Sequence, residues 1–175
     1  MRNWLGPLLF GLIVAAATTW AAISYMPFAL MNVAMDRLGQ GGLNNMSYGA
    51  LATAARQPIV RPSPDLAYSS CPYDLSAGPL AIDVTPVPGR YSSLSIFDAA
   101  TDVIFVRNDA QAGGKSYRII VARDGQAVPA GAEVVRTNHD KGIALIRLLL
   151  RDPAEITGLD AVRHQSSCAT VTKLK

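Results

Sequence analysis

Residues 66–84 read LAYSSCPYDLSAGPLAIDV and carry the pattern of a strand, a turn and a second strand. The runs Leu66–Leu75 and Leu80–Val84 are rich in apolar and β-favouring side chains. Between them, Ser76-Ala77-Gly78-Pro79 has the composition of a turn. The stretch therefore predicts two strands of a β-rich domain.

The same pattern of short strands and breaks continues toward the C-terminus. Leu94 and Ile96 alternate with serines, as in a half-buried strand. The further strands that we expect are Tyr91–Phe97, Val103–Val106, Ser116–Ala122, Val134–Arg136 and Ile143–Leu150. Such spacing favours a sandwich or barrel over a parallel βαβ sheet. We predict a mainly β, β-sandwich-like soluble domain with one or two short helices.

Two segments predict those short helices. Asn44 or Asn45 is placed to cap a helix that would end at Arg56. Later, Asp152-Pro153-Ala154-Glu155 combines a cap, a first-turn proline and a Glu at the third helical position, which is a capping-box arrangement. Apolar residues then recur every third position, at Ile156, Leu159 and Val162. We expect this late helix to cover an open edge or end of the sheet.

The N-terminal segment has no charged residue between Asn3 and Met35. Residues 8–25 read LLFGLIVAAATTWAAISY, and about 20 apolar residues are enough to cross the hydrocarbon of a bilayer. Trp4 at one end and Trp20 toward the other suit the two membrane interfaces. We predict a transmembrane signal anchor in residues 1–35 that contacts membrane lipid, followed by an extracytoplasmic β-rich domain in residues 36–175.

An uncleaved anchor is favoured over two alternatives. A cleaved secretory signal would end after small residues such as those at 15–17, but the apolar run continues past them. A buried core helix would usually show a polar stripe, and this segment has none. Arg2 is the only charge before the span, while Asp36 and Arg37 cancel after it. The positive-inside rule then places the domain on the periplasmic side of the inner (cytoplasmic) membrane.

The two cysteines, Cys71 and Cys168, both lie outside the apolar segment. In an oxidising compartment a disulfide that closes so long a loop would contribute about 3–5 kcal/mol on the loop-entropy account. Two buried free thiols are the alternative, because cysteine is a common core residue. We favour the disulfide, which agrees with a periplasmic domain.

Several classes of function lack support in the sequence. The net charge is +3 and the basic residues are scattered, without interleaved aromatics, so a nucleic-acid partner is not expected. His139 and His164 belong to no metal-binding spacing, and no glycine-rich cofactor motif is present, so neither a metal nor a cofactor is expected. No nucleophile motif accompanies either histidine, and we assign no catalytic residue.

Carboxylates near predicted turns leave one enzymatic alternative. Asp98 and Asp102 flank the link at 99–101, and Asp65 and Asp74 bracket a strand. Aspartates at such positions usually accept hydrogen bonds from backbone amides, and we favour that interpretation. A hydrolase-like enzyme that uses Asp65 and Asp98 ranks lowest among the functions considered.

Three blocks of sequence occur in a recognisable order. They are Ser63–Ser70 with Asp74–Pro79, then Gly89–Leu94 running on to Phe97-Asp98-Ala99, then Val135–Asn138 with Ala144–Arg147. In order and spacing, from about Leu43 to the C-terminus, they resemble the bacterial domain-of-unknown-function family 1254. The resemblance implies a β-sandwich-like domain with little established chemistry.

The resemblance also implies a partner and a candidate site. In longer relatives a second β-rich domain, family 1214, follows in the same chain, and this sequence ends before such a domain. We therefore expect a membrane-anchored, stand-alone form that docks a companion protein of the family 1214 type. If the opening loop forms a polar site in relatives, the corresponding ligand-binding candidates here are Asp65, Tyr68, Asn138 and Arg147.

These observations rank three functions. The first is a non-catalytic partner or accessory module of the cell envelope, which fits the anchor and the expected companion. The second is a small-molecule-binding module with a polar pocket lined by the four candidate residues. The third is the hydrolase-like enzyme.

Overall fold

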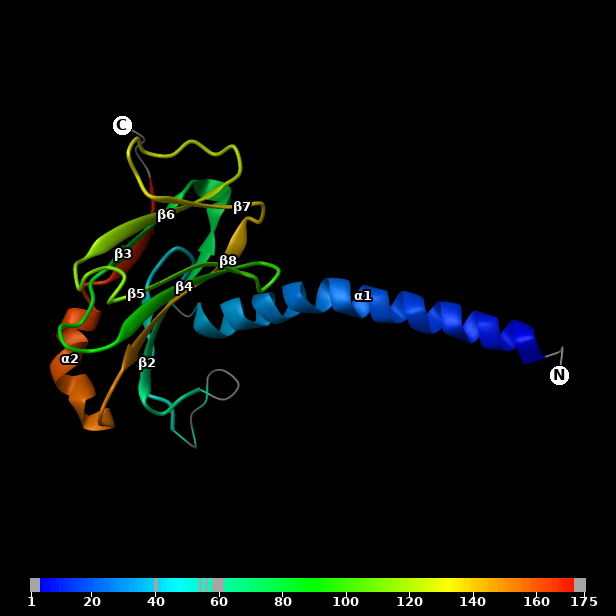
Figure 1. Cartoon of the computed structure of the whole chain (residues 1–175), viewed down its shortest axis with the longest axis horizontal. Coiled ribbons are helices and arrows are strands. Elements are labelled where there is room, and N and C mark those ends of the chain that lie inside the picture. Colours follow the sequence, from blue (N-terminus) through cyan, green and yellow to red (C-terminus); the bar gives the residue numbers. More distant parts are fainter. Residues whose placement is uncertain (1–3, 40, 54, 56, 58–61, 172–175) are drawn as a thin grey trace.

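The structure is a computed structural model that describes residues 4–39, 41–53, 55, 57 and 62–171. One long helix, α1 (Leu5–Leu38), projects from a body made of strands (Figure 1). The body contains two sheets, one with the strand order β1-β2-β8-β4-β5 and the other with the order β7-β6-β3-β9. This arrangement confirms the predicted fold class, a mainly β domain preceded by a long apolar helix.

Most of the strands lie where the sequence predicts them. Their bounds are β1 (Ser47–Tyr48), β2 (Leu66–Asp74), β3 (Leu80–Val84), β4 (Ser92–Asp98), β5 (Val103–Asn108), β6 (Tyr117–Arg123), β7 (Val134–Thr137), β8 (Lys141–Leu149) and β9 (Ser167–Thr170). Two strands are missing from the predicted set: β1, whose two residues pair with Ser69 and Ser70 of β2, and β9, which pairs with β3.

The link between β2 and β3 carries the chain from one sheet to the other. It contains a short 3₁₀ turn, η2 (Leu75–Ala77), which begins where the Asp74 carboxylate accepts a hydrogen bond from the Ser76 amide at 2.9 Å. β2 then pairs with β8 along its whole length, from Leu66 opposite Leu149 to Asp74 opposite Lys141. β3 instead pairs with β6 and β9. The strand–turn–strand stretch thus joins the two layers of a sandwich.

The core lies between the inner faces of the two sheets. From the five-stranded sheet, Tyr73, Leu94 and Ile96 are completely or almost completely buried. From the four-stranded sheet, Ile82 and Ile119 meet them in the same cluster. β3 shows why the strands bury one face, because its residues alternate between buried and half-buried side chains.

A disulfide joins the two layers through this core. Cys71 of β2 and Cys168 of β9 are bonded, with their Cα atoms 6.5 Å apart and 97 residues apart in sequence. Both residues are buried, at 0% and 5% exposure. The bond therefore holds the five-stranded sheet against the four-stranded sheet and closes most of the soluble domain into one loop.

The last third of α1 packs on the outer face of the five-stranded sheet. Met31 and Met35 are buried there against Ile143, with Phe97 at the margin. Every residue from Trp4 to Trp20 is exposed. Within the described residues, α1 is the helix long and apolar enough to cross a membrane, judged by length and composition. The helix continues past Met35 to Leu38, so the contact with the sheet lies at its C-terminal end.

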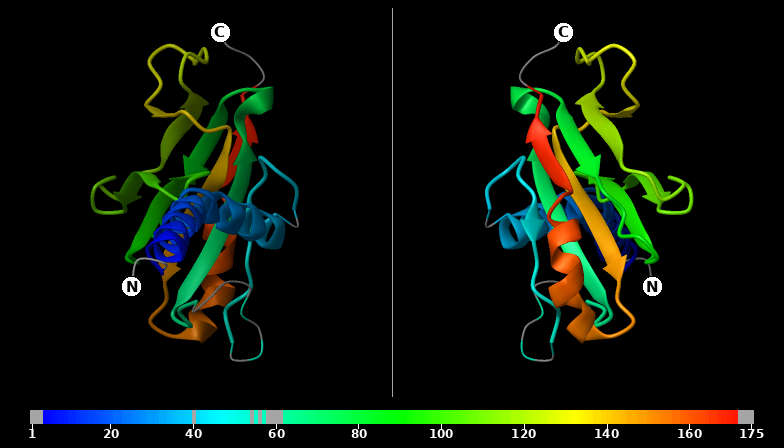
Figure 2. Two further views of the ribbon diagram at one scale, coloured as in Figure 1. Left: turned by 90° about the vertical axis from the view of Figure 1, so that its right-hand side faces the viewer. Right: turned by 90° about the vertical axis from the view of Figure 1, so that its left-hand side faces the viewer.

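The late helix closes one end of the sandwich. Asp152 begins it, since its carboxylate accepts a hydrogen bond from the Ala154 amide at 2.8 Å. A 3₁₀ turn, η3 (Pro153–Glu155), leads into α2 (Ile156–Arg163). The apolar side of α2 packs against Ala67 and Leu148, which face the interior beyond the reach of the second sheet. Figure 2 shows α2 on the side of the body opposite α1.

The early helix predicted from Asn44 or Asn45 is wrong. Asn44 has a φ of 57°, and its side-chain amide bonds the backbone N–H and carbonyl of Asp74 and the Thr170 hydroxyl instead of capping a helix. The following residues extend beside β2, where the Gly49 amide donates to the Tyr68 carbonyl at 2.9 Å. These tertiary hydrogen bonds outweigh a weak helical pattern. Arg56, the expected end of the helix, lies outside the described residues.

The disulfide predicts a large and separable contribution to stability. A Cys71→Ala/Cys168→Ala variant should lose about 4 kcal/mol of unfolding free energy, because its unfolded chain is no longer cross-linked. Chemical denaturation of the detergent-solubilised full chain measures this loss. Added reductant should lower the stability of the parent protein and leave the double variant unchanged. Equal sensitivity of both proteins to reductant would contradict this account.

Gly142 of β8 predicts a steric requirement for glycine. A Cβ at this position would collide with the Phe97 carbonyl oxygen and the Tyr73 hydroxyl. Gly142→Ala should therefore lower the unfolding free energy by about 1–3 kcal/mol, as overpacking does. Gly158→Ala is the matched control, because Gly158 lies within α2 with open space around it. That change should stabilise the protein by up to about 1 kcal/mol through helix propensity. Equal effects of the two changes would contradict the steric explanation.

Candidate functional site

Tyr68 and Arg147 lie side by side on the outer face of the five-stranded sheet. The strand register places Tyr68 of β2 opposite Arg147 of β8, and Arg147 opposite Ser93 of β4. The Arg147 guanidinium donates a hydrogen bond to the Ser95 hydroxyl at 3.2 Å. The Tyr68 phenol oxygen accepts one from the Ser63 amide at 3.0 Å. Two of the four candidate ligand-binding residues are thus neighbours.

Arg147 differs from the described basic residues that form ion pairs. It is half-buried, and no carboxylate of the described chain lies within ion-pair distance of it. The basic residues that do form ion pairs with carboxylates are Arg90 with Glu155, Arg107 with Glu133, Arg118 with Asp83, Arg123 with Asp140, Lys141 with Asp74 and Arg163 with Asp160. A guanidinium is always charged in proteins, so this one retains the capacity to bind an anion.

The other two candidates occupy different places. Asp65 directly precedes β2, with an exposed side chain and a backbone carbonyl that accepts a hydrogen bond from the Leu150 amide at 2.9 Å. It lies at the same end of the sheet as Tyr68. Asn138 is exposed and precedes Lys141, at the opposite end of β8. Lys141 and Arg147 are six residue steps apart along the strand, a distance of about 20 Å. The structure therefore brings together three of the four candidates at most.

An apolar pocket lies on the same outer face. It occupies about 200 Å³, and both α1 and the sheet contribute to its lining. The lining residues are Met31 and Leu38 of α1, Tyr68, Ser70, Phe97, Ile143 and Leu145 of the sheet, and Gly49, Ala50, Ala52 and Pro62 of the segment between them. Leu145 and Arg147 are two residues apart on β8, so their side chains point to the same side of the sheet. The Tyr68–Arg147 pair thus borders a pocket whose lining is mostly hydrocarbon. Neither the pocket nor its apolar character follows from a sequence motif.

His139 pairs with a buried carboxylate at the other end of the face. Its Nδ1 lies 2.9 Å from the Asp98 carboxylate, and its ring meets the edge of Phe28 of α1 with 5.5 Å between centroids. The second carboxylate oxygen of Asp98 accepts hydrogen bonds from the Ala100 and Asp102 amides, as an aspartate in a turn does. In the described chain no hydroxyl or thiol side chain bonds the His139 ring, so the pair has the geometry of a brace for the turn.

Asp65 and Asp98 do not form the carboxylate pair of a hydrolase. Asp98 lies opposite Gly142, and Leu66, the neighbour of Asp65, lies opposite Leu149. Gly142 and Leu149 are seven residue steps apart along β8, a distance of about 23 Å. Paired catalytic carboxylates in glycosidases are about 5–9.5 Å apart. Among the described residues there is also no group of three metal-ligating side chains.

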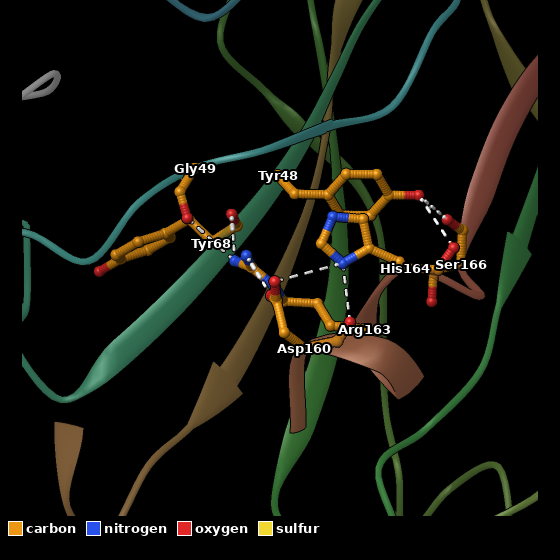
Figure 3. A network of polar contacts seen from close by, with 7 residues as sticks. All are labelled: Tyr48, Gly49, Tyr68, Asp160, Arg163, His164 and Ser166. Carbon is orange, nitrogen blue, oxygen red and sulfur yellow. Dashed lines mark hydrogen bonds and ion pairs between the residues drawn. The ribbon is translucent and has the colours of Figure 1, made fainter. Parts of the chain in front are cut away.

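A polar network ties α2 to the edge formed by β1 and β2 (Figure 3). The side chain of Arg163 is buried, and its guanidinium donates to the carbonyls of Gly49 and Tyr68 at 3.0 and 3.3 Å and to the Asp160 carboxylate at 2.8 Å. The Tyr48 hydroxyl donates to the Ser166 carbonyl at 2.5 Å. Burial raises the pKa of Tyr48, and the nearby Arg163 guanidinium partly opposes that rise. The satisfied donors and acceptors indicate a structural clamp.

These features define the class of protein. It is a two-sheet β domain closed by a disulfide, with a membrane-length helix packed on one face and an apolar pocket at the junction. Residues 43–170 match the family described as "Protein of unknown function (DUF1254)", and the chain belongs to this family. No protein in the curated collection matches the chain.

Two solved structures have a similar arrangement. The VPA0106 protein from Vibrio parahaemolyticus matches with a TM-score of 0.63 at 17% identity, over 87% of this chain and 38% of that chain. An uncharacterized protein from Burkholderia cenocepacia matches with a TM-score of 0.47 at 19% identity, over 63% of this chain and 32% of that chain. The Vibrio likeness shows the fold alone, and this chain spans less than half of the length of either structure.

The clamp of Figure 3 predicts a specific loss of stability. Arg163→Ala would remove the donor to the part-buried Gly49 carbonyl and the ion-pair partner of Asp160, while the Tyr68 carbonyl keeps its bond from the Gly49 amide, so we expect the unfolding free energy to fall by about 1–3 kcal/mol. Chemical denaturation of the full chain in detergent measures it. Arg151→Ala is the matched control, because the Arg151 side chain is exposed, and should change the unfolding free energy by less than about 0.5 kcal/mol. Equal losses in the two variants would argue against the clamp.

Proposed function

We propose that this protein is a non-catalytic accessory module of the cell envelope. In this proposal α1 anchors it in the inner membrane, the β-rich domain lies on the periplasmic face, and the domain docks a companion β-rich protein. The observation that carries the proposal is the junction between α1 and the five-stranded sheet. A domain attached through buried contacts, and not through a loose linker, keeps one fixed face toward the bilayer.

The dimensions of α1 support the anchor. Its 34 residues span about 51 Å at about 1.5 Å per residue, whereas the hydrocarbon of a bilayer is about 30 Å thick. The excess of about 20 Å corresponds to the C-terminal part, which contains Met31 and Met35 and packs on the sheet. The exposed part from Trp4 to Trp20 falls within the length that a membrane span requires.

The disulfide and the N-terminal charge support the compartment. Disulfides persist in oxidising surroundings such as the periplasm and are rare in the cytosol. The Cys71–Cys168 bond joins the two layers of the domain, so the whole domain shares that compartment. Arg2 before the span favours a cytoplasmic N-terminus and hence a periplasmic domain.

Two observations support a companion. The similar Vibrio structure continues well beyond the part that this chain matches. The resemblance to family 1254 implies a family 1214 domain in longer relatives, and a protein of that type is the companion that we propose. A docking edge is available at β5, an edge strand of the five-stranded sheet whose Val103 and Val106 are 54% and 56% exposed. Edge strands with exposed apolar side chains are sites for strand addition.

Crosslinking in the native membrane tests the docking edge. We expect a photoreactive phenylalanine analogue at Val106 to crosslink one discrete β-rich protein of the family 1214 type, because β5 would contact that partner directly. The same analogue at Arg118, an exposed position in the other sheet, should give no such product. Mass spectrometry of the crosslinked band identifies the partner.

Protease treatment of the same cells tests the anchor and the orientation. Protease added to spheroplasts should digest the β-rich domain and leave a membrane-embedded fragment that contains α1. A domain protected from protease in intact spheroplasts would overturn the periplasmic assignment. The absence of any product at Val106, or identical products at Val106 and Arg118, would overturn the companion.

A further inference from the structure

The pocket beside α1 has the chemistry of a hydrocarbon-binding site. Its lining consists chiefly of aliphatic and aromatic side chains, contributed by both α1 and the sheet. Its volume of about 200 Å³ exceeds the roughly 150 Å³ of an apolar cavity that binds benzene. Two of the lining side chains, Met31 and Leu38, are flexible or branched aliphatic groups that adapt to an apolar guest. Water in such a pocket would find few polar partners.

The position of the pocket determines from where a guest would enter. The pocket lies at the C-terminal end of α1, on the face from which the helix projects. The left view of Figure 2 looks onto this face, with α1 running toward the viewer. If α1 spans the bilayer as proposed, this face is directed toward the lipid headgroups. An apolar pocket in that position faces the membrane, with Met31 about 10 Å beyond the hydrocarbon at about 1.5 Å per helical residue.

A positively charged side chain, that of Arg147, lies at the border of the pocket. Arg147 follows the lining residue Leu145 by two positions on β8, about 7 Å along the same face. Its guanidinium bonds the neutral Ser95 hydroxyl and, within the described chain, pairs with no carboxylate. An anionic group attached to the end of a hydrocarbon chain would find this cation two residues, about 7 Å, beyond the lining residue Leu145.

We propose that this pocket binds a long-chain fatty carboxylate, with part of the chain between α1 and the sheet and the carboxylate at Arg147. Each part of the ligand matches one part of the site: apolar lining for the chain and a half-buried guanidinium for the anion. The volume accommodates a segment of one chain, so the second chain of a diacyl lipid would have to remain outside the pocket. This inference goes beyond the proposed function, and it depends on the placement of α1 in a membrane but not on the companion.

Photolabelling of the full chain in lipid nanodiscs tests the site. A fatty acid with a diazirine on its chain should label peptides that contain Met31 to Leu38 and Gly49 to Ala52, and excess unlabelled palmitate should remove that label. Labelling of the exposed span from Trp4 to Trp20 reports ordinary lipid contact and should resist competition. A diacyl phospholipid with the same diazirine should label the span only.

Two pairs of matched variants separate the chain contact from the charge contact. Leu145→Gln places a polar group in the pocket and should weaken competable labelling about tenfold. Leu149→Gln makes the same change on the same face of β8 outside the pocket and should have no effect. Arg147→Gln should weaken labelling by the carboxylate about tenfold and leave labelling by the corresponding fatty alcohol unchanged, whereas Arg151→Gln should alter neither. Thermal unfolding of each variant confirms that the fold is retained.

Several results would overturn the inference. Label confined to the span, or pocket label that palmitate does not compete, would show that no site exists. Equal effects of Leu145→Gln and Leu149→Gln would exclude the pocket. Equal loss of acid and alcohol labelling in Arg147→Gln would exclude the carboxylate contact. Pocket labelling by the diacyl lipid would exclude the single-chain ligand. Loss of the companion crosslink at Val106 with intact photolabelling would leave this inference standing and remove only the docking proposal.

Discussion

The contact between the end of α1 and the outer face of the five-stranded sheet is the constraint on which the rest of the arrangement depends. Met31 and Met35 are the residues of α1 that become fully buried, and they do so against Ile143. Those contacts join the continuous helix α1 directly to the sandwich. They also cover part of the outer face of the sheet, and α1 forms one wall of the apolar pocket.

Several separate contacts stabilise the sandwich itself. The disulfide between Cys71 and Cys168 holds the two layers together in the interior. Arg163 holds α2 to the edge at Gly49 and Tyr68, and Asn44 ties the link after α1 to Asp74. Each of these contacts joins segments far apart in the chain. These contacts leave the outer face beside α1 accessible. On that face the half-buried Arg147 borders the pocket.

Much of the fold followed from local patterns, and the reasons for the failures are specific. The alternation around Leu94 and Ile96 correctly indicated β4, and the cap at Asp152 correctly indicated the late helix. The helix predicted from Asn44 was wrong because an asparagine side chain bonds backbone groups in a turn as readily as at the start of a helix. β1 carried no signal, because two residues are too few to show a period.

The candidate site was predictable only in part for a related reason. Tyr68 and Arg147 were named from the family resemblance, and the register of β2 against β8 makes them neighbours. The same resemblance named Asn138, which the register places at the far end of β8. The pairing of His139 with Asp98 joins residues 41 apart in sequence and has no local signature. Residue types can indicate chemistry, but only strand register decides which of them meet.

By itself, the sequence determined that this protein has an uncharged helix of membrane length and a domain of short strands. Both follow from properties of neighbouring residues: hydrophobicity without a charge, and apolar side chains that alternate between breaks. The tertiary structure alone decided that β2 and β3 belong to different sheets, that α1 covers one outer face, and that a pocket lies between them. Those outcomes depend on packing between distant segments, where shape and register select among partners that the sequence leaves equally available.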